Sequence, residues 1–278
     1  MCAFKGWNDA GEAATSAVAF MGASLDAARF ATIDPEEFVD FQSTRPSVRL
    51  TDSLSRKIEW PEFEFYEARV PRAPRDLILL SGPEPAMRWR TFCEKVIELA
   101  EAIGVQMVVT LGALLADVPH TRPVSITGMA SDQALIDRLG LQPPSYEGPT
   151  GIVGVLHAAC SDAGMPSASL WAAVPHYVAV SPNPKAALAL LRRLESLVGV
   201  TVDAGELETA AADYDRQVSR AVELDPEVQA FVERLERAAD EEEPDGTGDL
   251  PSGDTIAREF QRFLRQRGSG GPPPTAGG

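Results

Sequence analysis

The chain has 278 residues, of which 44% are hydrophobic, enough for one large or two small domains with a sizeable core. Its formal net charge of −16 excludes the broad basic surface that binds nucleic acid or anionic membranes. No apolar run reaches the ~18 residues that span a bilayer. The sequence therefore predicts a soluble cytoplasmic protein that binds neither nucleic acid nor membrane.

The N-terminal third begins with a strand that turns into a helix through Gly6-Trp7-Asn8-Asp9-Ala10-Gly11. Apolar residues at helical spacing predict one helix over residues 10–30. Two short strand-like runs follow, at 31–33 and 38–41. Residues 47–70 then alternate between apolar and charged side chains, which predicts antiparallel hairpin structure with one wet face.

The middle of the chain alternates short continuous apolar runs with helical patterns, as βαβ units do. The predicted strands cover residues 77–80, 105–111, 123–127 and 169–174, and the predicted helices 86–103, 131–139, 150–163 and 182–198. We expect a mainly parallel sheet covered on both faces. Right-handed crossovers would bring the loops at 6–11, 81–85, 112–117 and 175–184 to one edge of that sheet.

After residue 200 the pattern is helical, with Asp225-Pro226 predicted to start the last helix of an α/β/α domain over 1–238. Residues 239–278 form a second segment with three parts. Residues 240–254 hold seven acidic side chains and no basic one, which is typical of a disordered linker. Residues 256–267 predict an amphipathic helix of net charge +3, and a flexible end follows.

Two glycine turns at predicted helix starts are candidate ligand sites. Gly6–Gly11 aims backbone N–H groups at the loop edge, and Asn8 and Asp9 add side-chain acceptors for an anion or polar ligand. The alternative is a plain helix cap, with Asn8 or Asp9 bonding the first turn and Gly6 at positive φ. In the second turn, Gly148–Gly151, Thr150 is the predicted N-cap, and close helix packing is the alternative.

Two single side chains are further candidates. Arg45, in Phe41-Gln42-Ser43-Thr44-Arg45-Pro46, either holds a carboxylate or phosphate or pins the hairpin through an ion pair. His176, at the end of the last predicted strand, acts as a general base or hydrogen-bond donor, or is simply packed.

Neither a metal site nor a catalytic set is indicated. The cysteines, Cys2, Cys93 and Cys160, are far apart in sequence, which favours buried reduced thiols. The three histidines are scattered, so we expect no metal and no cofactor. The chain has no G-x-S-x-G elbow and no recognisable Ser/His/Asp or Cys/His order, so we assign no catalytic residue.

Four segments together resemble a known family. Gly6–Gly11, Asp40–Pro46, Gly148–Ile152 and Pro175-His176-Tyr177 occur here in the order found in the actinobacterial branch of the proteasome assembly chaperone 2 family. The resemblance covers roughly residues 1–235. It implies a three-layer α/β/α fold like that of nucleoside phosphorylases, with self-association, as a trimer. Related eukaryotic chaperones help to build the 20S proteasome and dock through a C-terminal hydrophobic-Tyr-x tail, which Thr275-Ala276-Gly277-Gly278 does not match.

Two functions remain as hypotheses. The first is a self-assembling, non-catalytic protein with a chaperone or assembly role, which contacts a partner or its own oligomer through residues 255–267. The second is an enzyme or binder of a nucleoside- or phosphate-type ligand that uses Asn8, Asp9, Arg45 and His176 at the loop edge of the sheet.

Overall fold

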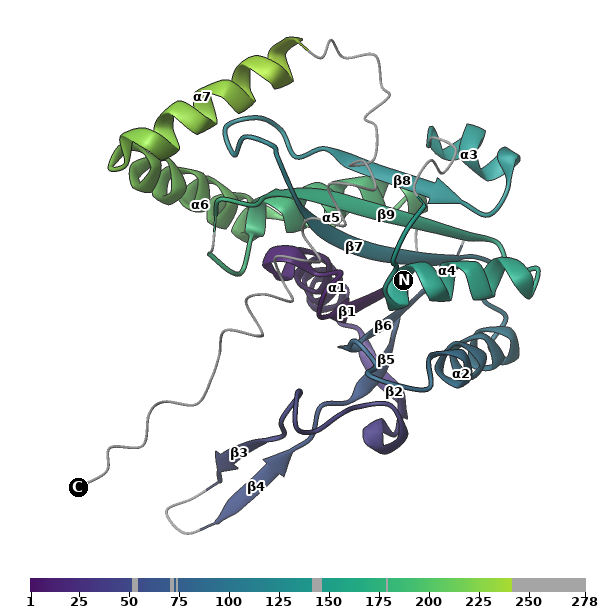
Figure 1. Ribbon diagram of the computed structural model, residues 1–278. Coiled ribbons are helices and arrows are strands. Elements are labelled where there is room, and N and C mark those ends of the chain that lie inside the picture. The colour runs from purple at the N-terminus through teal and green to yellow at the C-terminus, as the bar shows by residue number, and fades with distance from the viewer. Residues whose placement is uncertain (52–54, 71–72, 74, 142–146, 179, 242–278) are drawn as a thin grey trace.

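A seven-stranded sheet organises the computed structural model, which describes residues 1–51, 55–70, 73, 75–141, 147–178 and 180–241 (Figure 1). The strand order is β2-β5-β6-β1-β7-β9-β8. The strands are β1 (Cys2–Lys5), β2 (Ala28–Ile33), β5 (Phe63–Ala68), β6 (Leu77–Pro83), β7 (Val108–Ala116), β8 (Ile126–Ala130) and β9 (Ser167–Pro175).

The centre of the sheet is parallel and its margins are antiparallel. Strands β6, β1, β7 and β9 run in one direction, whereas β5 and β8 run the opposite way. The parallel strands carry the continuous apolar runs predicted to be buried on both faces. Their carboxyl ends meet at one edge, so the predicted gathering of loops there is confirmed for the loops after β1, β6, β7 and β9.

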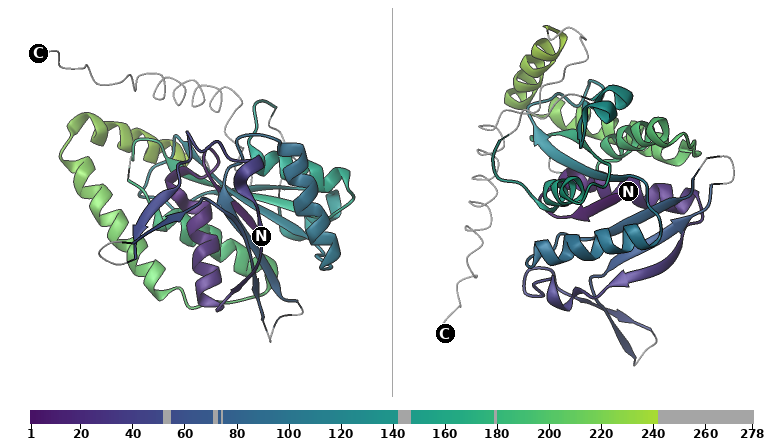
Figure 2. Two further views of the ribbon diagram at one scale, coloured as in Figure 1. Left: turned by 90° about the horizontal axis from the view of Figure 1, so that it is seen from below. Right: turned by 90° about the vertical axis from the view of Figure 1, so that its right-hand side faces the viewer.

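Helices cover both faces of the sheet, as Figures 1 and 2 show from three directions. Helices α1 (Ala13–Ser24) and α5 (Pro184–Val198) pack together on one face, and α2 (Trp89–Ala102) and α4 (Ile152–Asp162) on the other. The short α3 (Gln133–Leu139) follows β8. Outside α5 lies α6 (Gly205–Glu223), which leads into α7 (Pro226–Glu241). The predicted α/β class with a mainly parallel, mixed sheet is confirmed.

Each face of the sheet has its own core. On the α1 side, Ala13, Ala14 and Ala17 are fully buried and let the helix lie close to the strands and to α5. On the α2 side, four phenylalanines form edge-to-face and tilted contacts, the Phe63 and Phe92 ring centroids being 4.7 Å apart. This second core holds the three cysteines, which are buried as predicted.

Strands β3 (Ser47–Leu50) and β4 (Arg56–Glu59) form the predicted antiparallel hairpin. It projects from the β2–β5 end of the molecule (Figure 1). The predicted hairpin region extended to residue 70, but its last part is β5, which pairs with β2 and β6 in the main sheet.

Two predicted strands were misplaced for physical reasons. Residues 38–41 form no strand; they follow a short 3₁₀ turn at Pro35–Glu37, and Phe38 is buried because its ring packs on Phe92, with centroids 5.5 Å apart. The predicted stop at Gly112 is also wrong, because β7 continues to Ala116. A Cβ at Gly112 would lie 2.5 Å from the Trp171 ring, so this glycine makes room for a cross-strand neighbour.

Helix boundaries differ more than helix identities. The helix predicted over 10–30 ends at Ser24, because residues from Ala28 onward pair as β2. Asn183 starts α5 as predicted, accepting the Ala186 N–H at 3.0 Å, and Pro184 follows it. Asp225 likewise starts α7, accepting the N–H groups of Glu227 and Val228.

The predicted disordered linker began at residue 240, but Asp240 and Glu241 form the end of α7, and Asp240 binds Arg122. From residue 242 onward, the predicted linker, the amphipathic helix 256–267 and the flexible end lie outside the described residues. Among the helices that are described, none combines the length and the apolar character needed to cross a membrane.

Candidate functional site

The Gly6–Gly11 loop folds as a helix cap. Both oxygens of Asp9 are used: Oδ1 accepts the N–H groups of Ala14 (2.8 Å) and Thr15 (3.2 Å), and Oδ2 accepts the Thr15 hydroxyl. Burial raises the pKa of Asp9, and these hydrogen bonds oppose that shift. Gly11 has φ +60°, a conformation that favours glycine, and its carbonyl accepts the Asn183 N–H at 2.7 Å. The loop thereby joins the starts of α1 and α5.

Glu84, which the sequence did not single out, occupies the position expected for an anion. Its Oε2 accepts the Trp7 N–H at 3.2 Å, and its Oε1 accepts the Ile152 N–H at 3.1 Å, at the start of α4. One carboxylate thus links the two predicted glycine turns. A Cβ on Gly6 would lie 2.8 Å from Cβ of Glu84, which explains the glycine at that position. The chain's own carboxylate therefore serves the backbone donors that were candidates for a phosphate.

Asn8 has a buried polar atom in this region that lacks a hydrogen-bond partner. Its side chain is buried, and its Oδ1 has no hydrogen-bond partner among the described residues. A Cβ on Gly151 would lie 1.9 Å from that oxygen and 2.7 Å from Oε1 of Glu84. The Asn8 oxygen therefore faces the turn before α4, where a donor would satisfy it.

Among the described residues, neither Thr150 nor Arg45 forms a hydrogen bond or ion pair with Asn8, Asp9 or Glu84. The residue that caps α4 is Gly151, so the predicted N-cap at Thr150 is wrong; the Thr150 hydroxyl lies over Gly154, where a Cβ would come within 2.1 Å of it. Arg45 is exposed before β3 and forms no ion pair with a described residue. Its charge adds to the hydrogen bonds of Gln42 and Ser43 that lower the pKa of Asp40.

His176 lies at the same edge of the sheet but packs under α7. Its ring meets the Phe231 ring edge-on, with centroids 5.4 Å apart, and its Nδ1 lies 2.9 Å from the Asp117 carboxylate. Among the described residues, no hydrogen bond or ion pair joins His176 to Asn8, Asp9 or Arg45. These contacts agree with the alternative in which His176 is simply packed.

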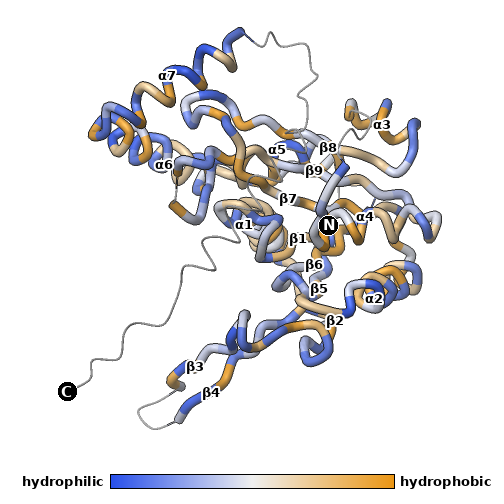
Figure 3. Tube along the Cα trace, in the orientation of Figure 1, coloured by the Kyte–Doolittle hydropathy of each residue, from blue (hydrophilic) through white to orange (hydrophobic). Residues whose placement is uncertain are grey.

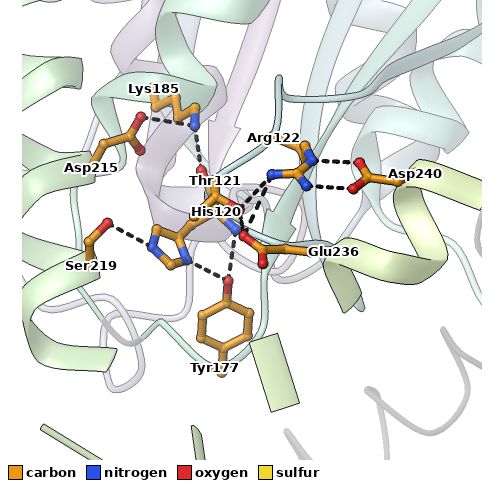
Figure 4. Close-up of polar contacts among 9 residues, drawn as sticks. All are labelled: His120, Thr121, Arg122, Tyr177, Lys185, Asp215, Ser219, Glu236 and Asp240. Carbon is orange, nitrogen blue, oxygen red and sulfur yellow. Dashed lines mark hydrogen bonds and ion pairs between the residues drawn. The ribbon is translucent and has the colours of Figure 1, made fainter. Parts of the chain in front are cut away.

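A second polar cluster at this edge centres on His120, which is buried in the β7–β8 connection (Figure 4). The Tyr177 hydroxyl oxygen accepts the His120 backbone N–H at 2.7 Å and lies 2.8 Å from His120 Nδ1. On the other side of the ring, Nε2 lies 3.1 Å from Ser219 Oγ on α6. All groups are satisfied when Tyr177 donates to Nδ1 and Nε2–H donates to Ser219.

The electrostatics of the cluster favour this neutral form. Burial lowers the pKa of His120; the Lys185 ammonium acts in the same direction, and the Asp215 and Glu236 carboxylates oppose the shift without reversing it. Burial raises the pKa of Tyr177 to about 12, so its hydroxyl keeps its proton. Lys185 donates to the His120 carbonyl oxygen and pairs with Asp215 on α6 at 2.9 Å.

The same connection holds α7. The Arg122 guanidinium binds Asp240 through two hydrogen bonds of 2.7 Å, and it lies 3.6 Å from Glu236, which also accepts the Thr121 hydroxyl (Figure 4). The cluster therefore ties five separate parts of the chain together: the β7–β8 and β9–α5 connections, α5, α6 and α7.

Neither reactive thiols nor a metal centre appears in the described part of the chain. Burial raises the pKa of Cys93 and of Cys160 to about 12, and it raises that of Cys2, so these thiols stay protonated at neutral pH. No group of three or more metal-ligating side chains is gathered within the described residues. The geometry supports helix capping and the docking of α6 and α7.

Sequence reasoning overlooked both Glu84 and the His120 cluster. Glu84 stands in Ser81-Gly82-Pro83-Glu84-Pro85, a segment predicted only as a loop, although an acid at a strand end of the loop edge was a usable signal. The partners of His120 lie 57 and 99 positions away, at Tyr177 and Ser219, so no local pattern announces them.

Comparison with known proteins connects this geometry to a family. The sequence profile of the PAC2 family matches residues 3–222. A comparison with curated proteins found no match.

Solved structures give the same result. A PAC2 family protein from Streptomyces avermitilis is 50% identical, with a TM-score of 0.78 over 83% of this chain and 97% of that one. A proteasome-assembly chaperone homologue from Mycobacterium tuberculosis is 46% identical, with a TM-score of 0.77 over 83% of this chain and 98% of that one. An archaeal proteasome activator from Pyrococcus furiosus shares the fold, with a TM-score of 0.64 over 80% of this chain and 92% of that one, at 19% identity.

Proposed function

Because the chain belongs to the PAC2 family, we propose that it is a self-associating, non-catalytic cytoplasmic protein that assists the assembly of a protein complex. The observation that carries the proposal is the 46% identity, over 83% of the chain, to a protein described as a proteasome-assembly chaperone homologue. The proteasome is therefore the complex to test first. Self-association as a trimer is the oligomeric state proposed.

The local chemistry supports a binding role over a catalytic one. Three polar side chains at the loop edge serve the fold: Asp9 caps α1, Glu84 bonds the start of α4, and His120 is enclosed between Tyr177 and Ser219. Side chains engaged in this way hold backbone and helices in place, which favours a structural role for them over a catalytic one.

Assembly from purified parts is the decisive experiment. The α- and β-subunits of the proteasome from the same genome would be mixed with and without this chain, and assembly intermediates followed by native mass spectrometry. We expect a complex that contains this chain and α-subunits, and faster formation of the full particle. The absence of any mixed complex, together with unchanged assembly kinetics, would contradict the proteasome role.

The C-terminal segment provides a second arm of that experiment. A chain truncated after residue 254 lacks the predicted amphipathic helix at 255–267, whose net charge of +3 suits an acidic partner. We expect the truncated chain to lose the mixed complex or its self-association. Unchanged mass, melting temperature and partner binding would remove this segment from the proposal.

The buried, unpartnered Oδ1 of Asn8 favours one alternative function, the binding of a small molecule at the loop edge. Because Glu84 already serves the backbone donors there, a nucleoside that offers an N–H or O–H group fits this oxygen better than inorganic phosphate. Thermal-shift measurements with nucleosides and with phosphate test the alternative. A nucleoside-dependent rise in melting temperature that disappears in Asn8→Ala supports it, and no rise with any nucleoside rejects it.

A further inference from the structure

The β3–β4 hairpin exposes an apolar face. Val48 pairs with Ile58, and Leu50 lies two residues along the same strand, so all three side chains share one face of the hairpin. Their exposed fractions are 60%, 50% and 66%, and Trp60, directly after β4, is 48% exposed. Figure 3 shows these apolar stretches on the projecting arm. A two-stranded hairpin is marginally stable alone, so an apolar face of this kind is normally covered.

The opposite face of the hairpin is polar, because apolar and polar side chains alternate along both strands. Arg49 forms a 2.7 Å ion pair with Glu59 across the two strands on that face. Arg56 pairs with Leu50 and is exposed on the apolar face, whereas Lys57 pairs with Arg49 and is exposed on the polar face. Neither Arg56 nor Lys57 forms an ion pair within the described residues. Residues 45–60 carry four cations and two acids in a chain whose net charge is −16. The hairpin therefore carries an excess of positive charge and one apolar face.

The α6–α7 corner has the complementary character. Leu224, between the two helices, is 86% exposed. The acids on either side of it, Glu223 and Glu227, are exposed and unpaired among the described residues. Residues 205–241 as a whole hold eleven acids and four bases. This corner is therefore an exposed apolar side chain with an anionic rim.

In Figure 1 the hairpin projects at the bottom of the molecule and the α6–α7 corner lies at the upper left, so one chain cannot bring its own hairpin to its own corner. We propose that the apolar face of the β3–β4 hairpin docks on the α6–α7 corner of a second copy of this chain. Because the contact joins two different surfaces, it is heterologous, and repetition closes a ring or extends a chain of copies. This inference rests on the self-association in the proposed function and names the surfaces that would produce it.

Three variants test the contact. The hairpin variant combines Val48→Thr, Leu50→Thr and Ile58→Thr. Threonine favours strand structure, so the hairpin is kept while its apolar surface is removed. The corner variant is Leu224→Ser. The matched control is Ile103→Ser, which removes an exposed apolar side chain from the end of α2. Circular dichroism and melting temperature check the fold of each variant.

Sedimentation velocity of the pure proteins gives the readout. We expect each interface variant to raise the self-dissociation constant by about 30-fold or more, the size of an interface hot spot near 2 kcal/mol. The control is expected to match the wild type. Because the hairpin is cationic and the corner is anionic, raising salt from about 0.05 to 0.5 M is expected to weaken wild-type association.

Mixing the two interface variants distinguishes a heterologous contact from a self-complementary one. The corner variant keeps an intact hairpin, and the hairpin variant keeps an intact corner, so their mixture is expected to form 1:1 dimers although each alone is monomeric. A mixture that stays monomeric overturns the proposal, as does a hairpin variant with the wild-type mass. If the hairpin variant misfolds, Arg56→Glu with Lys57→Glu replaces it, with loss of association again expected.

The outcome separates this inference from the proposed function. The sedimentation assay contains no other protein, so an unchanged oligomer in both interface variants rejects these surfaces while leaving self-association intact. A monomeric wild-type protein rejects the docking contact and the proposed self-association together, and proteasome assembly would still be decided by the reconstitution experiment.

Discussion

Replacing Tyr177 by phenylalanine removes a single oxygen on which two groups of His120 depend. The hydroxyl accepts the His120 backbone N–H at 2.7 Å and lies 2.8 Å from Nδ1. The phenylalanine ring keeps the edge contact with Phe231, whose centroid is 5.9 Å away, so packing is retained. The change therefore isolates the polar contribution of the hydroxyl.

The expected loss follows from the number of partners left without a hydrogen bond. A buried donor or acceptor without a partner costs about 1–3 kcal/mol. Because His120 is buried and both of its groups lose the same partner, we expect Tyr177→Phe to lower the free energy of unfolding by about 2–4 kcal/mol. In a chain of this size, that loss lowers the melting temperature by about 5–12 °C.

Urea denaturation followed by circular dichroism measures this loss, with Tyr66→Phe as the control. The Tyr66 hydroxyl donates to Glu64 at 2.9 Å, and that carboxylate also binds the exposed Arg29 at 2.7 Å. Water and Arg29 can replace the lost hydroxyl, so we expect the control to lose less than about 1 kcal/mol. Equal losses in the two variants, within about 0.5 kcal/mol, would refute the role assigned to the His120 cluster.

Three further predictions follow from the same contacts. Burial lowers the pKa of His120 below 6.5 in the folded chain, so the unfolded chain takes up the proton first and the free energy of unfolding falls as pH drops below about 6.5. Urea titrations between pH 7.5 and 5 should show a smaller fall in His120→Gln than in the wild type, and parallel curves would contradict the assignment. Glu84→Ala removes the acceptor of two backbone N–H groups and should lower the free energy of unfolding by about 2–4 kcal/mol, whereas the exposed Glu94→Ala should change it by less than about 0.5 kcal/mol; similar losses would argue against a capping role. Gly151→Ala places a Cβ 1.9 Å from the Asn8 oxygen, so it should destabilise the protein by more than about 2 kcal/mol, and less in an Asn8→Ala background; strict additivity in a double-mutant cycle would show that the two residues do not meet.

The sequence predicted those elements whose pattern is local. The run at residues 77–80 and the helices after Asn183 and Asp225 were found because a continuous apolar stretch or a cap with proline is a short-range signal. The strand predicted at residues 38–41 was wrong because an aromatic side chain such as Phe38 can enter the core from a turn as well as from a strand. Gly112 misled the prediction because the reason for the glycine, the Trp171 ring, lies on the neighbouring strand.

The candidate site shows the same limit more strongly. The sequence identified the glycine turns at 6–11 and 148–151 and placed the first of them at the loop edge of the sheet, but it did not show that Glu84 would connect the two. His176 was singled out because it ends a strand, whereas His120, which organises the more extensive cluster, had no motif around it. In both cases the deciding partners come from other elements, and only the packing of the chain brings them together.

The loop edge of the sheet and the β3–β4 hairpin differ in how their charged side chains are paired. At the loop edge, the Glu84 carboxylate accepts hydrogen bonds from backbone N–H groups. Arg122 and Lys185 form ion pairs with acids on α7 and α6. On the hairpin, by contrast, Arg56 and Lys57 form no ion pair within the described residues, and the apolar side chains of the same hairpin are exposed. Charges paired internally stabilise a fold, whereas unpaired charges around an exposed apolar face favour association with a complementary surface. The hairpin is therefore the part of the chain where a change should affect association and leave the fold intact.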